Sequence, residues 1–218
     1  MTPSGQSLLT LPFRLERAAP PFEGNDIKYP ESLARHFIGL YSRKGQRVFD
    51  PFAGLGTTLF VAEELGRKAY GVEADPMRHE WVAGQLDNWM GLTCGDSAQV
   101  ARMGFAKMDF IMTSPPYMPV TDKYNPLAGG NPVQAGYDRY LKRMALIFER
   151  LTQVAKRGAH LVVHVDNIQG RRFTPLVRDI GAAVARSWRQ TDEVVVQWDK
   201  TQGYTHCLIF TNHPTGNK

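Results

Sequence analysis

Apolar residues along the chain fall into short runs and helical spacings that follow one another in alternation. Short apolar runs predict strands at 47–50, 68–73, 92–94, 108–113 and 160–165. Apolar positions three or four residues apart predict helices at 29–45, 59–66, 137–156 and 173–188. Asp75-Pro76 is expected to cap one more helix, with apolar positions Trp81, Val82, Leu86 and Trp89. The runs 194–198 and 207–210, with a turn at Gly203 between them, predict an antiparallel hairpin.

This alternation of strands and helices predicts an α/β fold with a mostly parallel sheet. Helices cover both faces of such a sheet, and the final hairpin adds one antiparallel strand. Residues 1–27 contain four prolines and are predicted to form an irregular arm, whose Phe13 and Phe22 pack back onto the body. Residues 28–218 are then expected to form a single domain.

Composition narrows the class of protein. The chain has 218 residues of which 43% are hydrophobic, enough for one folded core. No apolar run approaches the about 20 residues of a membrane span, and we expect no secretory leader. The net charge of +5 permits a polyanionic partner without proving one. Cys94 and Cys207 are too few for a disulfide framework or a four-ligand zinc site, so we expect reduced thiols in the cytoplasm; no metal-ligand spacing is evident.

A glycine-rich turn follows the first of these strands. Gly54 and Gly56 let the backbone approach a ligand closely, and the next helix directs free N–H groups at the turn. Glu73 ends the following strand, where a carboxylate suits the hydroxyls of a ribose. The third glycine of a dinucleotide fingerprint is replaced by Leu59, and Asp50 would repel a pyrophosphate but attract an ammonium group. The pattern therefore favours S-adenosylmethionine (SAM), a nucleoside cofactor with an amino-acid end.

A second motif follows the strand predicted at 108–113. In residues 114–117 (SPPY) two prolines make a stiff extended corner that presents the carbonyls of Ser114 and Pro115 outward. A carbonyl and a hydroxyl at the mouth of the sheet can bind an exocyclic amine. The ring of Tyr117 offers a surface on which a planar base can stack.

Residues 50–58 (DPFAGLGTT), followed by 114–117 (SPPY), make the chain resemble the SAM-dependent amino-methyltransferases of DNA over roughly residues 26–212. The resemblance implies a Rossmann-like sheet of seven strands, SAM as cofactor and a cytosine N4 or adenine N6 amine as target. It implies that Glu73 binds the ribose, Asp96 the adenine amino group, and the Tyr29-Pro30 segment the methionine end. The implied cofactor residues are Tyr29, Pro30, Asp50, Pro51, Phe52, Ala53, Gly54, Gly56, Thr57, Glu73 and Asp96, and the implied catalytic residues are Ser114, Pro115, Pro116 and Tyr117.

The serine of the second motif resembles cytosine-N4 enzymes more often than adenine-N6 enzymes, which typically carry aspartate there. Both targets in DNA stay open, as does an exocyclic amine in RNA. A non-catalytic binding subunit is a further alternative, disfavoured by the intact motifs. Carbon methylation of cytosine is also disfavoured, because in that family the nucleophilic cysteine follows a proline, whereas Cys94 follows Thr93 and Cys207 follows His206.

The predicted mechanism needs no strong base. Hydrogen bonds from the amine to the Pro115 carbonyl and the Ser114 hydroxyl would pull its nitrogen toward tetrahedral geometry, so that positioning does most of the catalysis. The target base must be flipped out of a duplex or supplied unpaired.

The long segment 118–136 is expected to be a mobile loop over the substrate, with Lys123, Tyr124 and Asn125 as candidate substrate-binding residues. The remaining residues leave no room for a separate target-recognition domain. Sequence specificity would then be short, relaxed or supplied by a partner. His164, Asp166 and Asn167 end a predicted strand, where they are candidates for the border of the pocket, although His164 is interpreted as a satisfied core residue. The oligomeric state is not indicated.

Overall fold

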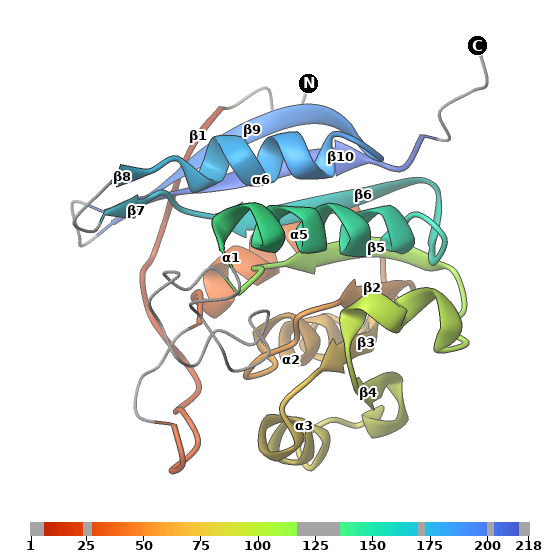
Figure 1. Cartoon of the computed structure of the whole chain (residues 1–218). Coiled ribbons are helices and arrows are strands. Elements are labelled where there is room, and N and C mark those ends of the chain that lie inside the picture. The colour runs from red at the N-terminus through yellow and green to blue at the C-terminus, as the bar shows by residue number, and fades with distance from the viewer. Residues whose placement is uncertain (1–6, 24–27, 117–135, 170–172, 200–202, 214–218) are drawn as a thin grey trace.

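One eight-stranded sheet organises the computed structural model, which describes residues 7–23, 28–116, 136–169, 173–199 and 203–213. Its strand order is β1-β9-β10-β6-β5-β2-β3-β4 (Figure 1). The strands are β1 (Leu8–Leu11), β2 (Arg47–Asp50), β3 (Lys68–Glu73), β4 (Leu92–Cys94), β5 (Met108–Thr113), β6 (Ala155–Val165), β9 (Arg189–Trp198) and β10 (Tyr204–Thr211). A separate two-stranded sheet pairs β7 (Ile168–Gln169) with β8 (Phe173–Thr174).

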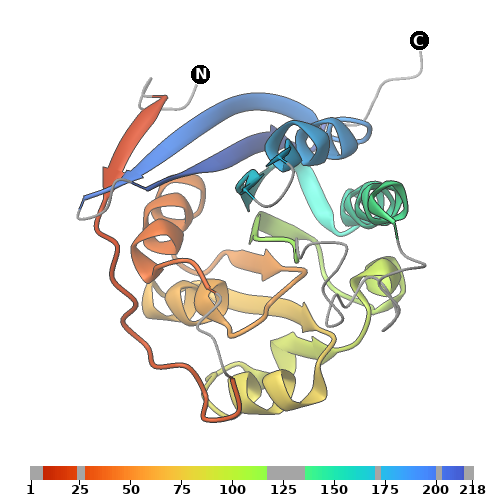
Figure 2. The ribbon, with the colours of Figure 1, turned by 60° about the vertical axis from the view of Figure 1, so that its left-hand side comes forward.

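Helices cover both faces of the large sheet (Figures 1 and 2). The α-helices are α1 (Glu31–Tyr41), α2 (Thr57–Glu64), α3 (Pro76–Ala83), α5 (Tyr137–Leu151) and α6 (Leu176–Val184), and two 3₁₀ helices are η1 (Trp89–Gly91) and η2 (Ser97–Arg102). Helices α1, α2 and α3 share one apolar cluster with one face of the sheet, and α5, α6 and η2 share another with the opposite face. Within β5, Ile111 belongs to the second cluster whereas Phe110 and Met112 belong to the first, as the alternation of a strand requires.

The predicted fold class is confirmed. All neighbouring strands of the large sheet run parallel except β10, which is antiparallel to both β6 and β9. The strands predicted at 47–50, 68–73, 92–94 and 108–113 have the bounds of β2, β3, β4 and β5. Among the described residues no helix combines the length and the apolar character that a membrane crossing requires.

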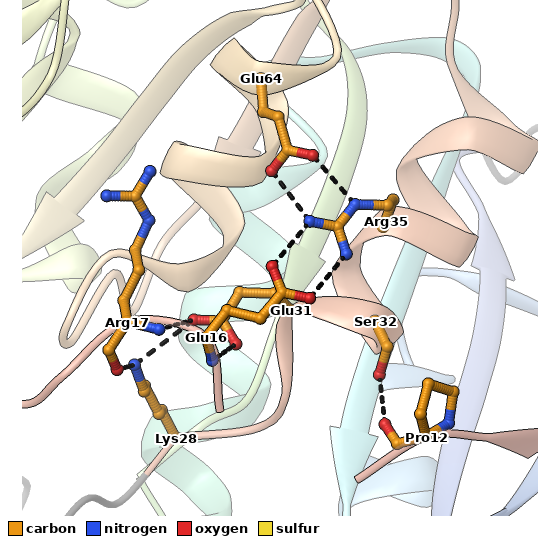
Figure 3. A network of polar contacts seen from close by, with 8 residues as sticks. All are labelled: Pro12, Glu16, Arg17, Lys28, Glu31, Ser32, Arg35 and Glu64. Atoms are coloured by element: carbon orange, nitrogen blue, oxygen red, sulfur yellow. Dashed lines mark hydrogen bonds and ion pairs between the residues drawn. The ribbon is translucent and has the colours of Figure 1, made fainter. Parts of the chain in front are cut away.

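The predicted irregular arm is wrong at one place. Residues Leu8–Leu11 form β1, an eighth strand that pairs parallel with β9. The rest of the described arm is held by α1 (Figure 3): the buried Glu31 carboxylate accepts hydrogen bonds from the backbone N–H groups of Glu16 and Arg17, at 3.0 and 3.2 Å. Phe13 contacts the edge of Trp198 with ring centroids 5.3 Å apart, as predicted, although both Phe13 and Phe22 stay largely exposed.

All five predicted helices have bounds that differ from the expected ones: α1 spans 31–41 and not 29–45, and α2 spans 57–64 and not 59–66. The other three differ for reasons that the structure shows. The helix expected to reach Lys156 ends at Leu151, because from Ala155 onward the backbone pairs with β5. The helix expected at 173–188 begins after Pro175, since the residue before a proline disfavours helical geometry and Phe173–Thr174 pairs as β8. The helix after Asp75 ends at Ala83, which leaves the expected apolar positions Leu86 and Trp89 outside it.

The chain order places a topological switch between β2 and β5. From β2 the chain moves outward through β3 and β4, then returns to β5 on the other side of β2. In open α/β sheets the crevice at the carboxyl ends of two such strands is the usual ligand site. Both sequence motifs follow these strands, so they meet at that crevice.

Candidate active site

The glycine turn between β2 and α2 needs its glycines for two different reasons. Gly54 and Gly56 both have positive φ, 53° and 80°, a region that side chains disfavour. A Cβ atom on Gly56 would stand 2.8 Å from Val82 Cγ1 and 2.9 Å from Phe60 Cε2, so packing also excludes a side chain. A Cβ atom on Gly54 would meet nothing closer than 3.8 Å. At Gly56 the packed core therefore leaves no room for a side chain, whereas at Gly54 there is room beside the backbone for a ligand.

The carboxylate of Glu73 braces this turn from the end of β3. Its Oε2 accepts the Gly54 N–H at 2.6 Å and its Oε1 accepts the Asp75 N–H at 2.8 Å. Burial raises the pKa of Glu73, and these two backbone donors oppose the rise. Each carboxylate oxygen keeps a further lone pair, so the group can still accept hydrogen bonds from ribose hydroxyls.

Asp50 lies at the end of β2 and is only 2% exposed. Its Oδ1 accepts the Phe52 N–H at 3.0 Å and the Thr113 hydroxyl at 2.6 Å, and its Oδ2 accepts the Thr58 hydroxyl at 2.6 Å. Burial raises the pKa of Asp50 to about 6, against the lowering effect of these donors. The Thr113 bond ties the end of β5 directly to the end of β2 across the switch point.

Tyr29 joins the same cluster from the segment before α1. Thr58 gives its only hydroxyl proton to Asp50, so the hydrogen bond between Thr58 and Tyr29 must be donated by the buried Tyr29 hydroxyl. Pro30 follows with extended backbone and is the N-cap of α1, which begins at Glu31. The Tyr29-Pro30 segment is thereby fastened to the cofactor turn.

The diproline corner begins at Ser114, directly after β5. Pro115 is buried, while Ser114 and Pro116 are half-buried. The Ser114 hydroxyl lies 3.1 Å from Nδ1 of His164, a buried residue near the end of the neighbouring strand β6. Thr113, the last residue of β5, thus bonds to Asp50, and the next residue, Ser114, bonds to His164, so that adjacent residues connect the two sequence motifs with β6.

Two predicted cofactor residues have internal partners. Asp96 caps η2 by accepting the Ala98 N–H at 2.9 Å, and its carboxylate forms an exposed ion pair with Arg143 of α5. The carbonyl of Pro51 accepts the buried Ser97 hydroxyl, which ties the glycine turn to η2. Both contacts keep the edge formed by β2, β3 and β4 assembled around the turn.

The residues present fit an adenosine cofactor with an amino-acid end. Gly54 leaves space above the turn, and Glu73 offers acceptor capacity beside it. The Thr57 hydroxyl, in the first turn of α2, is buried and has no hydrogen-bond partner among the described residues. Two buried carboxylates line the strand ends, which disfavours a phosphate group in the same place.

The structure brings most of the predicted site residues to one edge of the sheet. They are Tyr29, Pro30, Asp50, Pro51, Phe52, Ala53, Gly54, Gly56, Thr57, Glu73, Asp96, Ser114, Pro115 and Pro116. The candidates Tyr117, Lys123, Tyr124 and Asn125 lie outside the described residues, as does the predicted loop apart from Gly136, the N-cap of α5. Their roles stay predictions.

Sequence reasoning missed the polar residues that connect the motifs. Thr58 and Thr113 were noted only as parts of a motif and a strand. The interpretation of His164 as a buried, hydrogen-bonded residue is confirmed, but its contact with Ser114 was not predicted. The contact follows from strand pairing: Thr113 is in register with Val163, so Ser114 and His164, which follow them, lie side by side. In the part of the chain that the structure describes, no group of three or more His, Cys, Asp or Glu side chains could hold a metal ion.

The chain is similar to a known protein family over part of its length. The family model described as DNA methylase (N6_N4_Mtase) matches residues 15–83, which contain the Tyr29-Pro30 segment, the glycine turn and Glu73. The type II methyltransferase M.MjaI of Methanocaldococcus jannaschii is 41% identical over 56 residues, 26% of this chain and 18% of that relative. The type II methyltransferase M.SmaI of Serratia marcescens is 41% identical over 54 residues, 24% of this chain and 18% of that relative. The matched segments thus span less than a fifth of these relatives' own length.

Solved structures agree with the fold over most of the chain. TrmN from Thermus thermophilus aligns with a TM-score of 0.60 at 19% identity, covering 84% of this chain and 48% of that chain. Fibrillarin from Aeropyrum pernix, in complex with natively bound S-adenosyl-L-methionine, aligns with a TM-score of 0.53 at 12% identity, covering 82% and 73%. The Rossmann-like methyltransferase fold predicted from the sequence is therefore confirmed, with β1 as an addition to the seven expected strands.

Proposed function

We propose that this chain, whose residues 15–83 match the DNA methylase family model, transfers the methyl group of SAM to an exocyclic amine of a base in DNA. The observation that carries the proposal is the 2.6 Å hydrogen bond from Thr113 to Asp50. It joins the strand end that bears the diproline corner to the strand end that bears the glycine turn. A target base at Ser114 and a cofactor above Gly54 would then be close enough to react.

The cofactor side is assigned as follows. Glu73 would bind the ribose hydroxyls, Asp96 the adenine amino group, and Asp50 with the Tyr29-Pro30 segment the amino-acid end. Asp50 acts largely through the residues that it holds, because its carboxylate already accepts three hydrogen bonds. SAM, when bound, supplies an electrophilic methyl group on a positively charged sulfur.

On the target side, Ser114 and Pro115 would orient the amine. A base amine is a poor nucleophile because its lone pair is delocalised into the ring. Acceptance of its N–H bonds by the Ser114 hydroxyl and the Pro115 carbonyl would turn that lone pair out of the ring plane. The acceleration would come from orientation and not from a strong base, and the surplus proton would pass to solvent.

Cytosine N4 is the proposed target. The support is a serine at position 114, which stands where adenine-N6 enzymes typically carry aspartate. A flipped or unpaired base is required in either case. The net charge of +5 suits a nucleic-acid partner, and we place the reaction in the cytoplasm, in a restriction–modification, phage or regulatory setting.

A direct assay tests the proposal. The chain is incubated with methyl-labelled SAM and with duplex DNA, single-stranded DNA or RNA, and the digested nucleosides are identified. We expect label in N4-methylcytosine from DNA. Label in N6-methyladenine would correct the target, label in an RNA nucleoside would replace DNA by RNA, and no label in any arm would contradict the proposed activity.

Two serine substitutions separate catalysis from folding. Ser114→Ala should lower kcat by about 100-fold, the usual scale for loss of one transition-state hydrogen bond, while SAM affinity stays unchanged. The matched control is Ser187→Ala, whose buried hydroxyl has no partner among the described residues and which precedes β9 at the opposite edge of the sheet. Equal activity of the two variants would remove the role assigned to Ser114.

A further inference from the structure

We propose that His164 is a positioning residue that turns the Ser114 hydroxyl into an obligatory hydrogen-bond acceptor, so that the site admits an amine and rejects a ring carbonyl. The inference rests on the proposed function of the site, which it deepens by naming what selects the target group. It starts from a contact that neither sequence motif contains, the 3.1 Å approach of Ser114 Oγ to His164 Nδ1.

The backbone explains why these residues meet. Strands β5 and β6 are parallel neighbours, and their register pairs Met112 with Val162 and Thr113 with Val163. The next residues along the two strands are Ser114 and His164. His164 is only 7% exposed, so its ring has little access to water and its nitrogens depend on protein partners.

Those partners determine which ring nitrogen carries the proton. Nε2 lies 2.7 Å from the Thr205 hydroxyl on β10. The Thr205 side chain also forms a hydrogen bond that lowers the pKa of Asp166, against the raising effect of burial. A hydroxyl has one proton, and a carboxylate can only accept one. Thr205 therefore donates to Asp166 and accepts the proton of His164 Nε2.

With its proton on Nε2, the neutral imidazole has a bare Nδ1. The Ser114 hydroxyl must then donate to Nδ1, and the lone pairs of its oxygen are left for the substrate. Burial lowers the pKa of His164 to about 4, which keeps the ring neutral in ordinary buffers. A base amine can donate to this oxygen, whereas a ring carbonyl would face another acceptor.

The imidazole is also held on its cofactor side. The ring of Tyr29 packs against that of His164 with centroids 5.2 Å apart and planes inclined by 59°. Tyr29 is in turn bonded to Thr58, and Thr58 to Asp50. The orientation of Ser114 thus depends on the same side chains that fasten the cofactor turn.

Nitrogen NMR of the full chain tests the tautomer without any substrate. With ¹⁵N-labelled histidine we expect the His164 signals of a neutral ring protonated at Nε2. Ser114→Ala should shift the Nδ1 resonance, while Ser187→Ala should leave it in place. A ring protonated at Nδ1, or an Nδ1 resonance indifferent to Ser114→Ala, would overturn the inference. Because this readout needs no turnover, it stands even where the methylation assay fails.

Two isosteric variants test the consequence for the reaction. His164→Asn keeps an oxygen near the place of Nδ1 and can still accept from Ser114. His164→Gln places its amide near Nε2 and leaves Ser114 without an acceptor. We expect His164→Asn to retain kcat within about 3-fold and His164→Gln to lose at least about 10-fold, with SAM affinity unchanged in both. The opposite ranking would overturn the inference.

A double-mutant cycle shows whether His164 acts through Ser114. In a Ser114→Ala background His164→Gln should have no further effect on kcat, since the hydroxyl it positions is gone. Additive losses would mean that His164 acts independently of Ser114 and would contradict the inference. A wild-type chain that methylates no nucleic acid would instead contradict the proposed function and leave the tautomer measurement as the test of the contact.

Discussion

Two buried titratable side chains at the strand ends respond to pH in opposite directions. Burial raises the pKa of Asp50 from 3.8 to about 6 and lowers the pKa of His164 from 6.5 to about 4. The folded chain holds the Asp50 proton to a higher pH than the unfolded chain does, so this group lowers the unfolding free energy as the pH rises from 4 to 6. The folded chain releases the His164 proton at a lower pH, so that group raises the unfolding free energy over nearly the same interval. In the wild type the two effects largely cancel.

Single substitutions should reveal how each of the two side chains changes the unfolding free energy with pH. In Asp50→Asn the unfolding free energy should rise with pH between 4.5 and 6.5 relative to wild type, because the histidine effect is no longer opposed. In His164→Asn it should fall over the same interval. Over this interval each difference should amount to about 2 kcal/mol, since the interval spans most but not all of each pKa shift. Urea unfolding at three pH values measures both, and pH profiles parallel to that of wild type would contradict the burial effects.

At the residue scale, prediction from sequence succeeded where the residues of a site lie close together along the chain. Gly54, Gly56 and Glu73 lie where the glycine turn was expected, since a strand, a turn and a helix follow one another locally. His164 and Thr205 could not be found this way, because they are 41 residues apart and meet only through the register of β6 and β10. Pairing between distant strands decides such contacts, and a single sequence does not display it.

At the scale of elements, Glu31 fastens the arm to the body of the fold. This residue opens α1, is 2% exposed and accepts the backbone N–H groups of Glu16 and Arg17 (Figure 3). The nearby Arg35 forms paired hydrogen bonds with Glu16 and with Glu64 of α2, at 2.9 to 3.2 Å. The buried carboxylate carries more of the attachment than the exposed guanidinium pairs do.

Glu31→Gln should therefore loosen the arm. One amide N–H would face a backbone N–H in place of an acceptor, at a cost of about 1–3 kcal/mol. Hydrogen exchange at the amides of Glu16 and Arg17 should accelerate, while exchange inside the hairpin of β9 and β10 stays slow. The matched control is Glu64→Gln, which alters an exposed pair and should change stability by less than about 0.5 kcal/mol. Unchanged exchange at the arm in Glu31→Gln would show that the attachment lies elsewhere.

Element types were more predictable than element ends. The apolar positions of α5 predicted a helix, yet its end depends on Ala155, whose backbone joins β5 in the sheet. Strand β1 was missed because it lies in the proline-containing arm, outside the alternation of strands and helices, and its pairing with β9 makes it a strand. Tertiary pairing overrode local preference in both places.

At the scale of the whole molecule, the cofactor crevice differs in charge from the chain that holds it. The chain carries a net +5, but Asp50 and Glu73 place two buried carboxylates at the switch point. Under the proposed function, the positive charge elsewhere suits a polyanionic substrate, and the acidic crevice would repel a phosphate group at the cofactor position. Selection between cofactors would then follow from local charge and not from net charge.

Thermal unfolding should reveal this selection. SAM at 100 times its Kd should stabilise the chain by about 2.7 kcal/mol, and Tm should keep rising with the logarithm of SAM concentration. ATP without metal contains the same adenosine, with phosphates in place of the amino-acid end. It should give no shift at equal concentration, and an equal shift with ATP would contradict the assignment of the crevice to SAM.

The edge strands of the large sheet affect the tendency of the chain to aggregate at high concentration. The long strands β9 and β10, of 10 and 8 residues, lie inside it, whereas the outermost strands β1 and β4 have only 4 and 3 residues. The unpaired backbone of a long outer strand can pair with another chain and start aggregation, whereas a short outer strand offers few such groups. Strand β1 pairs with Val195–Trp198 of β9, so its detachment would leave this part of β9 unpaired as well. The small N-terminal strand thereby shortens the open edge that another copy of the chain could pair with.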